Sequence, residues 1–147
     1  MTVEHPSRPP EAWWSEEDQE WVHGERDDEG RLTGLVRYWD AGGVFISDAE
    51  HREDKPHGRA RRFYSDGSLA QECEYVAGHI EGVRKIYRPE SDQVETLPQL
   101  ARVHASVAVY ECVYRDGDLV GTRYRDGEGV EIEPHRGRPV PTRQVGS

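Results

Sequence analysis

The chain has 147 residues and a formal net charge of −10, and only 34% of its residues are hydrophobic. The charge argues against a general affinity for nucleic acid or anionic lipid, and no apolar stretch is long enough to cross a membrane. Seven Tyr and four Trp distinguish the chain from a disordered acidic tail, while fifteen Gly and nine Pro predict a thin fold with many turns.

The first predicted element is an N-terminal capping segment, residues 1–20, which is rich in Trp and acidic residues. Nine acidic residues lie within positions 11–29, against a single Arg, and Trp13, Trp14 and Trp21 crowd beside them. The end of a repeat sheet needs a cover, so we expect Trp13 and Trp14 to fold over the first strand. The alternative is that the rings are exposed and, within this acidic field, anchor a basic protein partner.

A repeat follows this segment, and Gly-x-x-x-Gly sequences mark it. The second glycines of three such sequences recur at a constant spacing, which gives a period of about 24 residues: Gly34, Gly58 and Gly82. At the fifth position after each of them stands an aromatic residue: Trp39, Phe63 and Tyr87. Within a unit, Asp66-Gly67 separates two runs rich in strand-forming residues, which is the signature of a hairpin turn. Each unit is therefore predicted to be a β-hairpin, and successive hairpins extend one antiparallel sheet.

The third and fourth units depart from this period. Asp54 already replaces the first Gly of the second unit, and Ser91 replaces the hairpin Gly of the third. The second glycine of the fourth unit is Gly121, well beyond the position one period after Gly82, which indicates an insertion at about 91–105. The insertion fits either a short helix after Pro98 or a loop that leaves the sheet. A tail that contains Pro and Arg, residues 134–147, ends the chain.

The phrase Glu-Cys-x-Tyr-x-x-Gly-x-x-x-Gly occurs twice, at 72–82 and at 111–121. A reactive Glu–Cys pair would need a His partner at a fixed place in the phrase, and the two copies share no His. We therefore interpret the phrase as a structural repeat, with Cys73 and Cys112 on the same side of the sheet. Equivalent positions of neighbouring hairpins lie about 10 Å apart, so the two thiols are predicted not to bond to each other.

Residues 54–87 carry a pattern that resembles the MORN repeat, and more closely its shorter bacterial variant. The matching positions are the Gly after Pro-His, Phe63-Tyr64, Asp66-Gly67, Leu69, Tyr75, Gly78 and Gly82. The resemblance implies an all-β fold, a single-layer antiparallel sheet of tandem MORN-like hairpins over residues 21–133. Proteins with the bacterial variant are often antitoxins or immunity-like components, while eukaryotic relatives act as scaffolds and lipid-proximal modules.

One face of the predicted sheet carries parallel rows of cations and rings. The third residue after each second Gly is basic, and the fifth is aromatic: Arg37 and Trp39, Arg61 and Phe63, Lys85 and Tyr87. These side chains either pack together between strands, with the cationic heads in water, or form a contact surface for an acidic partner.

No catalytic or metal-binding motif occurs in the sequence, and its seven His are scattered, so we expect no enzyme activity, cofactor or metal. The predicted function is a protein-binding module of the antitoxin or immunity type, cytoplasmic in location, which neutralises a basic toxin or effector by covering it. The alternative is a membrane-surface or scaffold module that binds acidic phospholipid headgroups. The candidate partner-binding residues are Trp13, Trp14, Glu16, Glu17, Asp18, Trp21, Arg37, Trp39, Arg61, Phe63, Lys85 and Tyr87.

Overall fold

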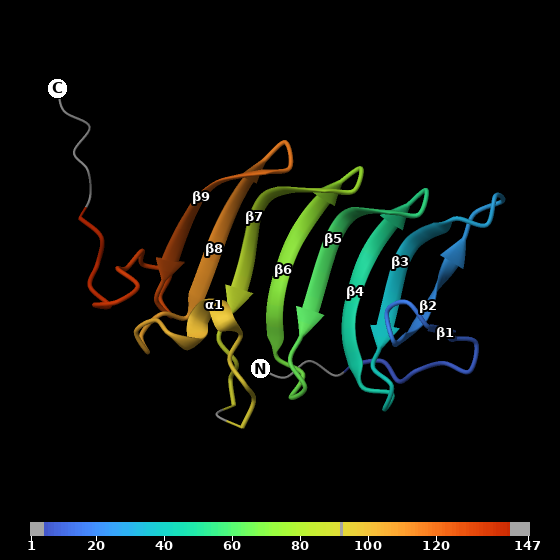
Figure 1. The fold of residues 1–147 in the computed structure, drawn as a ribbon, viewed down its shortest axis with the longest axis horizontal. Helices are drawn as coiled ribbons and strands as arrows, with labels where there is room; N and C mark the ends of the chain where they lie inside the picture. The colour runs from blue at the N-terminus through green and yellow to red at the C-terminus, as the bar shows by residue number, and fades with distance from the viewer. Residues whose placement is uncertain (1–4, 92, 142–147) are drawn as a thin grey trace.

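The computed structural model describes residues 5–91 and 93–141. Within these residues the chain forms one open antiparallel sheet of nine strands, each paired with the next strand in chain order (Figure 1). The strands are β1 (Trp13–Ser15), β2 (Glu20–Arg26), β3 (Leu32–Trp39), β4 (Phe45–Arg52), β5 (Lys55–Phe63), β6 (Leu69–Val76), β7 (His79–Tyr87), β8 (Val109–Arg115) and β9 (Asp118–Arg125). The predicted fold class, an all-β sheet built from successive hairpins, is confirmed.

Three of the hairpins close with two-residue turns in which both residues have a positive φ. They are Glu53-Asp54 (52° and 66°), Ala77-Gly78 (49° and 87°) and Asp116-Gly117 (54° and 83°). Turns of this kind match the twist of the flanking strands and favour Gly, Asn or Asp. Asp54 therefore takes the place of a repeat glycine because its short polar side chain tolerates the left-handed conformation.

The two faces of the sheet carry different side chains, because residues opposite each other in register share a face. We call one the ladder face; across β3 to β9 it carries Arg37, Asp48, Arg61, Glu72, Lys85, Glu111 and Arg123. We call the other the channel face; across β3 to β7 it carries Val36, Ala49, Ala60, Cys73 and Arg84.

An aromatic cluster on the ladder face forms the core of the N-terminal half. Trp39, Phe45 and Phe63 are 1%, 6% and 7% exposed. The segment before β1 crosses this cluster: the His5 ring lies 4.4 Å from that of Phe63, and Trp39 Nε1 donates a hydrogen bond of 2.9 Å to the Pro6 carbonyl oxygen. The N-terminal segment thus supplies a cover for this part of the sheet.

A second core cluster lies on the channel face at the C-terminal end. It contains Ile86, Leu100, Val107 and Ile132, each 2% exposed or less. Leu100 comes from the one-turn helix α1 (Pro98–Ala101), so the insertion contains a short helix that begins at Pro98. Burial of a side chain of this size stabilises the fold by about 1.5–3 kcal/mol, so the insertion acts as a second layer over β7 to β9.

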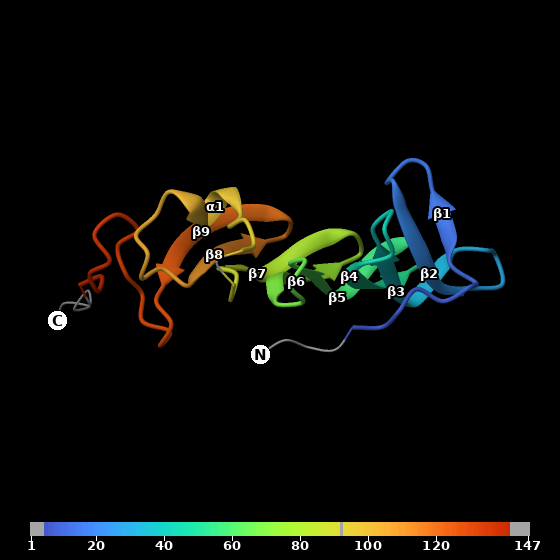
Figure 2. The same ribbon diagram turned by 90° about the horizontal axis from the view of Figure 1, so that it is seen from below.

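The hairpin of β1 and β2 rises from the sheet on the same side as α1, at the opposite end of the molecule (Figure 2). Trp14 packs edge-on against Trp21 with ring centroids 5.4 Å apart, and the Arg26 guanidinium lies 4.7 Å from the Trp13 ring centroid. The turn of this hairpin, 16–19, is exposed. No helix in the described ranges is long and apolar enough to cross a membrane.

Candidate binding site

One row of charged residues across the ladder face alternates in sign from strand to strand. In order from β3 to β9 they are Arg37, Asp48, Arg61, Glu72, Lys85, Glu111 and Arg123. Opposite charges directly across an antiparallel pair stabilise it, whereas like charges destabilise it. The row of cations predicted from the sequence is therefore interleaved with a row of acids on the intervening strands.

Asp48 occupies the first buried acidic position of this row. Its side chain is 4% exposed, and Arg61 holds it through two bonds, Nε to Oδ1 at 3.0 Å and Nη2 to Oδ2 at 2.5 Å. The same interaction raises the pKa of the Arg61 guanidinium. A buried carboxylate is tolerated when it is paired in this way. Arg61 therefore neutralises Asp48 within the sheet and is not a free cation.

Glu111 is the second buried acid and has several cationic partners. Its Oε1 accepts hydrogen bonds from Arg123 Nε at 2.5 Å and Arg125 Nε at 2.6 Å, and Lys85 Nζ lies 4.0 Å from Oε2. Burial acts to raise the pKa of Glu111, but the hydrogen bonds from Arg125 and Arg123 outweigh it, and the pKa lies below its ordinary value. Glu111 is therefore held in its charged form.

These contacts explain why the sequence Glu-Cys-x-Tyr-x-x-Gly-x-x-x-Gly occurs twice in the chain. The Glu of each copy, Glu72 or Glu111, is the acidic member of the ladder, and Asp48 stands one repeat period before Glu72 in the same role. Glu72 Oε1 also accepts a 2.6 Å hydrogen bond from the Tyr87 hydroxyl. This role was missed in the sequence, although the spacing from Asp48 to Glu72 carries the signal.

The residues predicted to bind a partner fall into four groups. Trp39 and Phe63 are buried in the aromatic cluster, and Trp13, Trp14 and Trp21 are half-buried in the N-terminal hairpin region. The ladder face holds Arg37, which is exposed, and three half-buried residues, Arg61, Lys85 and Tyr87. Glu16, Glu17 and Asp18 are exposed in the turn between β1 and β2.

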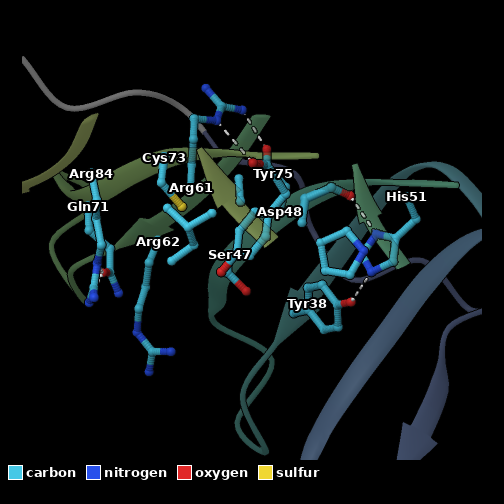
Figure 3. A pocket seen from close by; sticks show the side chains of 14 residues that line it. Tyr38, Ser47, Asp48, His51, Arg61, Arg62, Gln71, Cys73, Tyr75 and Arg84 are labelled. Carbon is cyan, nitrogen blue, oxygen red and sulfur yellow. Dashed lines mark hydrogen bonds and ion pairs between the residues drawn. The ribbon is translucent and has the colours of Figure 1, made fainter. Parts of the chain in front are cut away.

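A shallow channel crosses the strands on the channel face, and the sequence did not predict it. The channel runs from β3 to β7 and has a volume of about 350 Å³ (Figure 3). Small side chains that lie opposite one another in register form its middle: Ala49, Ala60 and Cys73. Ser47, Arg62 and Gln71 line one side, and His51, Pro56, Tyr75 and Ile80 line the other. A run of small residues between larger ones makes the depression.

The two ends of the channel differ in chemistry. At the β3 end, the Tyr38 hydroxyl lies 3.5 Å from His51 Nε2, and His51 Nδ1 lies 3.0 Å from the Ala49 carbonyl oxygen. At the β7 end, Arg84 donates from Nε and Nη2 to Gln71 Oε1 at 3.1 and 2.8 Å. The walls thus present hydrogen-bonding groups that are held in place by their neighbours.

The channel suits binding better than nucleophilic chemistry. Burial raises the pKa of the Cys73 thiol, which keeps it protonated at neutral pH and unreactive. Cys73 and Cys112 are both free, as predicted, and both lie on the channel face. Among the described residues, no group of three or more His, Cys, Asp or Glu side chains is placed to hold a metal ion.

Comparisons of the chain with protein-family models, with curated proteins and with solved structures find no match. The resemblance to MORN repeats therefore stays a prediction, and the assignment of function rests on the geometry of the two faces.

Proposed function

We propose that this protein is a non-enzymatic module that binds a protein partner through the channel face. The observation that supports this most directly is the uneven cover of that face. Its C-terminal end is packed under α1, its N-terminal end lies beside the raised β1–β2 hairpin, and the described part of the chain leaves the middle open (Figure 2). The open middle combines apolar side chains such as Ile80 with polar ones such as Gln71, and a partner supplies the second layer there.

The acidic turn of the β1–β2 hairpin favours a partner with a basic surface. Glu16, Glu17 and Asp18 are exposed there, and the turn lies on the channel side of the sheet. Clustered charges of one sign steer an oppositely charged partner towards the site and raise its association rate. We propose that this turn guides the partner and that the channel face holds it.

Within this function, we propose the antitoxin or immunity type of action, in which the module covers a basic toxin or effector. The alternative, binding of acidic lipid headgroups, would use Arg37, Arg61 and Lys85. Two of these cations already face buried acids: Arg61 is bonded to Asp48, and Lys85 approaches Glu111. The ion pairs leave the lipid alternative with less support than the protein-binding function.

The test uses the full chain as bait and then measures association with the partner that it captures. The triple variant Glu16→Gln, Glu17→Gln, Asp18→Asn is compared with a matched control, Asp116→Asn, Asp118→Asn, Glu128→Gln. Both sets remove three exposed acids, but the control residues lie in the β8–β9 turn region and the turn after β9.

We expect the hairpin variant to associate about three- to tenfold more slowly at low salt and to depend less on salt, because steering acts over about a Debye length. The control should behave like the unmodified chain. An association rate that rises with added salt, or equal effects from the two variants, would show that the acidic turn does not guide the partner.

A further inference from the structure

The channel has a cationic end, although the chain as a whole is acidic with a net charge of −10. Arg62 on β5 is exposed and points away from the sheet (Figure 3). Arg84 on β7 donates hydrogen bonds to Gln71, which lies on the intervening strand β6. Arg61 also borders the channel, but its guanidinium is bonded to Asp48 on the ladder face. The cations available to a ligand at this end are therefore those of Arg62 and Arg84.

The opposite end of the channel is acidic. Glu20 shares the channel face with Val22, which is opposite Tyr38 in the sheet, and Asp18 lies in the turn just before β2. Burial together with the charges of Asp18 and Glu20 raises the pKa of the Tyr38 hydroxyl to about 12, as expected when these carboxylates lie close to it. Negative charge thus lies close to Tyr38, on the strand two away from that of Arg62, and the charge of Arg62 reaches Glu20, where it acts to lower a pKa that burial raises.

The floor between the two ends leaves room for an extended chain. Ala49, Ala60 and Cys73 are the short side chains along the middle of the channel. Because the channel crosses the strands, a ligand within it runs across their direction and cannot pair with the sheet as an added strand. Recognition then falls to side chains, and the charges at the two ends determine which side chains fit.

We propose that the channel binds an extended segment of the protein partner that places an acidic side chain at Arg62 and Arg84 and a basic side chain at Asp18 and Glu20. This inference deepens the proposed function and rests on it. Strands lie about 4.8 Å apart, so β5 is about 10 Å and β7 about 19 Å from β3. An extended segment rises about 3.3 Å per residue, which separates the two charged residues of the ligand by about three to six positions.

The experiment selects peptides against the full chain and tests them on variants. A random twelve-residue peptide library is enriched on the immobilised protein, and the enriched sequences are synthesised and measured by fluorescence anisotropy. Ala60→Trp fills the floor of the channel. Arg62→Glu reverses the charge of an exposed side chain, and Arg52→Glu, at the end of β4 and outside the channel lining, makes the same charge change as a control.

We expect the enriched peptides to carry an acidic and a basic residue three to six positions apart. Their affinity should fall about tenfold or more with Ala60→Trp and with Arg62→Glu, and stay within about twofold with Arg52→Glu, because reversing a charge at the contact costs more than reversing a distant one. A peptide in which Lys replaces the acidic residue should bind Arg62→Glu better than the unmodified chain.

Three results would overturn the inference: no enrichment at all, enriched peptides without an acidic residue, or affinities that Arg62→Glu leaves unchanged. Thermal unfolding shows whether Ala60→Trp folds, and Arg62→Glu decides the matter if it does not. A captured protein partner that binds the unmodified chain and Arg62→Glu equally well would leave standing the part of the proposed function that concerns protein binding, and would remove the channel as its site.

Discussion

The two faces of the sheet come from the same repeats, yet their side chains vary in different ways from one repeat to the next. On the ladder face, each repeat sets a cation against an acid: Arg37 and Asp48, Arg61 and Glu72, Lys85 and Glu111. On the channel face, the residues one position after these cations have nothing in common: Tyr38, Arg62 and Ile86. The regular face stabilises the pairing of strands, and the irregular face offers chemistry that the fold does not require.

This difference follows from what each face must satisfy. Strand pairing makes a similar demand at each step of the sheet, so a cation opposite an acid recurs from repeat to repeat. The channel face meets a different neighbour at each point, with the β1–β2 hairpin at one end, α1 at the other and an open surface between them (Figure 2). Substitutions should therefore separate the faces: changes on the ladder face alter stability, and changes in the channel alter binding.

Removal of the Glu111 carboxylate should damage the ladder face most. Glu111 is only 4% exposed, and Glu111→Ala removes the acceptor that Arg123 and Arg125 share. Loss of one partner of a buried ion pair costs about 3–5 kcal/mol, and we expect about 3 kcal/mol because the arginines are partly exposed. Urea unfolding followed by circular dichroism measures the loss.

Glu74→Ala is the matched control for this change, because Glu74 is an exposed acid on the ladder face of β6. Its effect on the free energy of unfolding should stay within about 0.5 kcal/mol. If both variants unfold at the same urea concentration, the ladder contributes little and the comparison of the two faces fails.

Arg61 and Arg62 are neighbours in sequence on opposite faces, and they sharpen the comparison. Arg61→Ala removes the two hydrogen bonds to Asp48, and a bond to a buried charge contributes about 1.5–3 kcal/mol, so we expect a loss of about 2 kcal/mol. Arg62→Ala should change the free energy of unfolding by less than about 0.5 kcal/mol, because Arg62 is exposed. Equal losses from the two variants, measured by thermal unfolding, would contradict the division of roles.

The features that could be predicted from the sequence are those that local sterics and the alternation of strand residues impose. The turn glycines, and the rows led by Arg37, Arg61 and Lys85, follow from the constant repeat period and from strand geometry alone. The acids Asp48 and Glu72 lie on the second strand of each hairpin. Their pairing with those cations depends on the strand register, which the sequence alone does not fix.

The channel could not be predicted because it depends on the bending of the sheet and on what covers its ends. In the sequence, Ala49 and Ala60 are ordinary strand residues and do not indicate a depression. The depression exists only because larger side chains, such as Tyr38, Arg62 and Tyr75, surround them in the folded sheet. The packing of α1 is equally remote from the repeat, because Leu100 lies in the insertion that interrupts the period. Such arrangements are tertiary and leave no periodic trace in the sequence.

The ion pairs of Glu111 on the ladder face also determine how the free energy of unfolding depends on pH. The pKa of Glu111 in the folded protein lies below its ordinary value of 4.5. A carboxyl group of this kind stabilises the fold fully above its unfolded pKa, and the contribution is lost as the pH falls through the folded pKa. We expect the difference in free energy of unfolding between the unmodified chain and Glu111→Gln to be constant from about pH 7 to 5 and to shrink towards pH 3. A difference that grows in acid would contradict this assignment.

A further effect on stability is expected at Asp54, in a turn that belongs to neither face. Asp54 has a φ of 66°, and its Oδ1 accepts a 2.6 Å hydrogen bond from the Leu32 amide, which joins the turn to the neighbouring hairpin. Asp54→Asn keeps both features and should unfold within about 0.5 kcal/mol of the unmodified chain, whereas Asp54→Ala loses both and should cost about 1–2 kcal/mol.

Asp54→Gly separates the two contributions, because Gly accepts the positive φ and lacks the hydrogen bond to Leu32. We expect its melting temperature to lie between those of the Asn and Ala variants, and peptide affinity in the channel to be unchanged in all three. If Asp54→Gly matched the unmodified chain, the hydrogen bond to Leu32 would contribute nothing, and conformation alone would explain an Asp at this glycine position. If peptide affinity fell instead, the turns would set the shape of the channel, and stability and binding would not divide between the two faces.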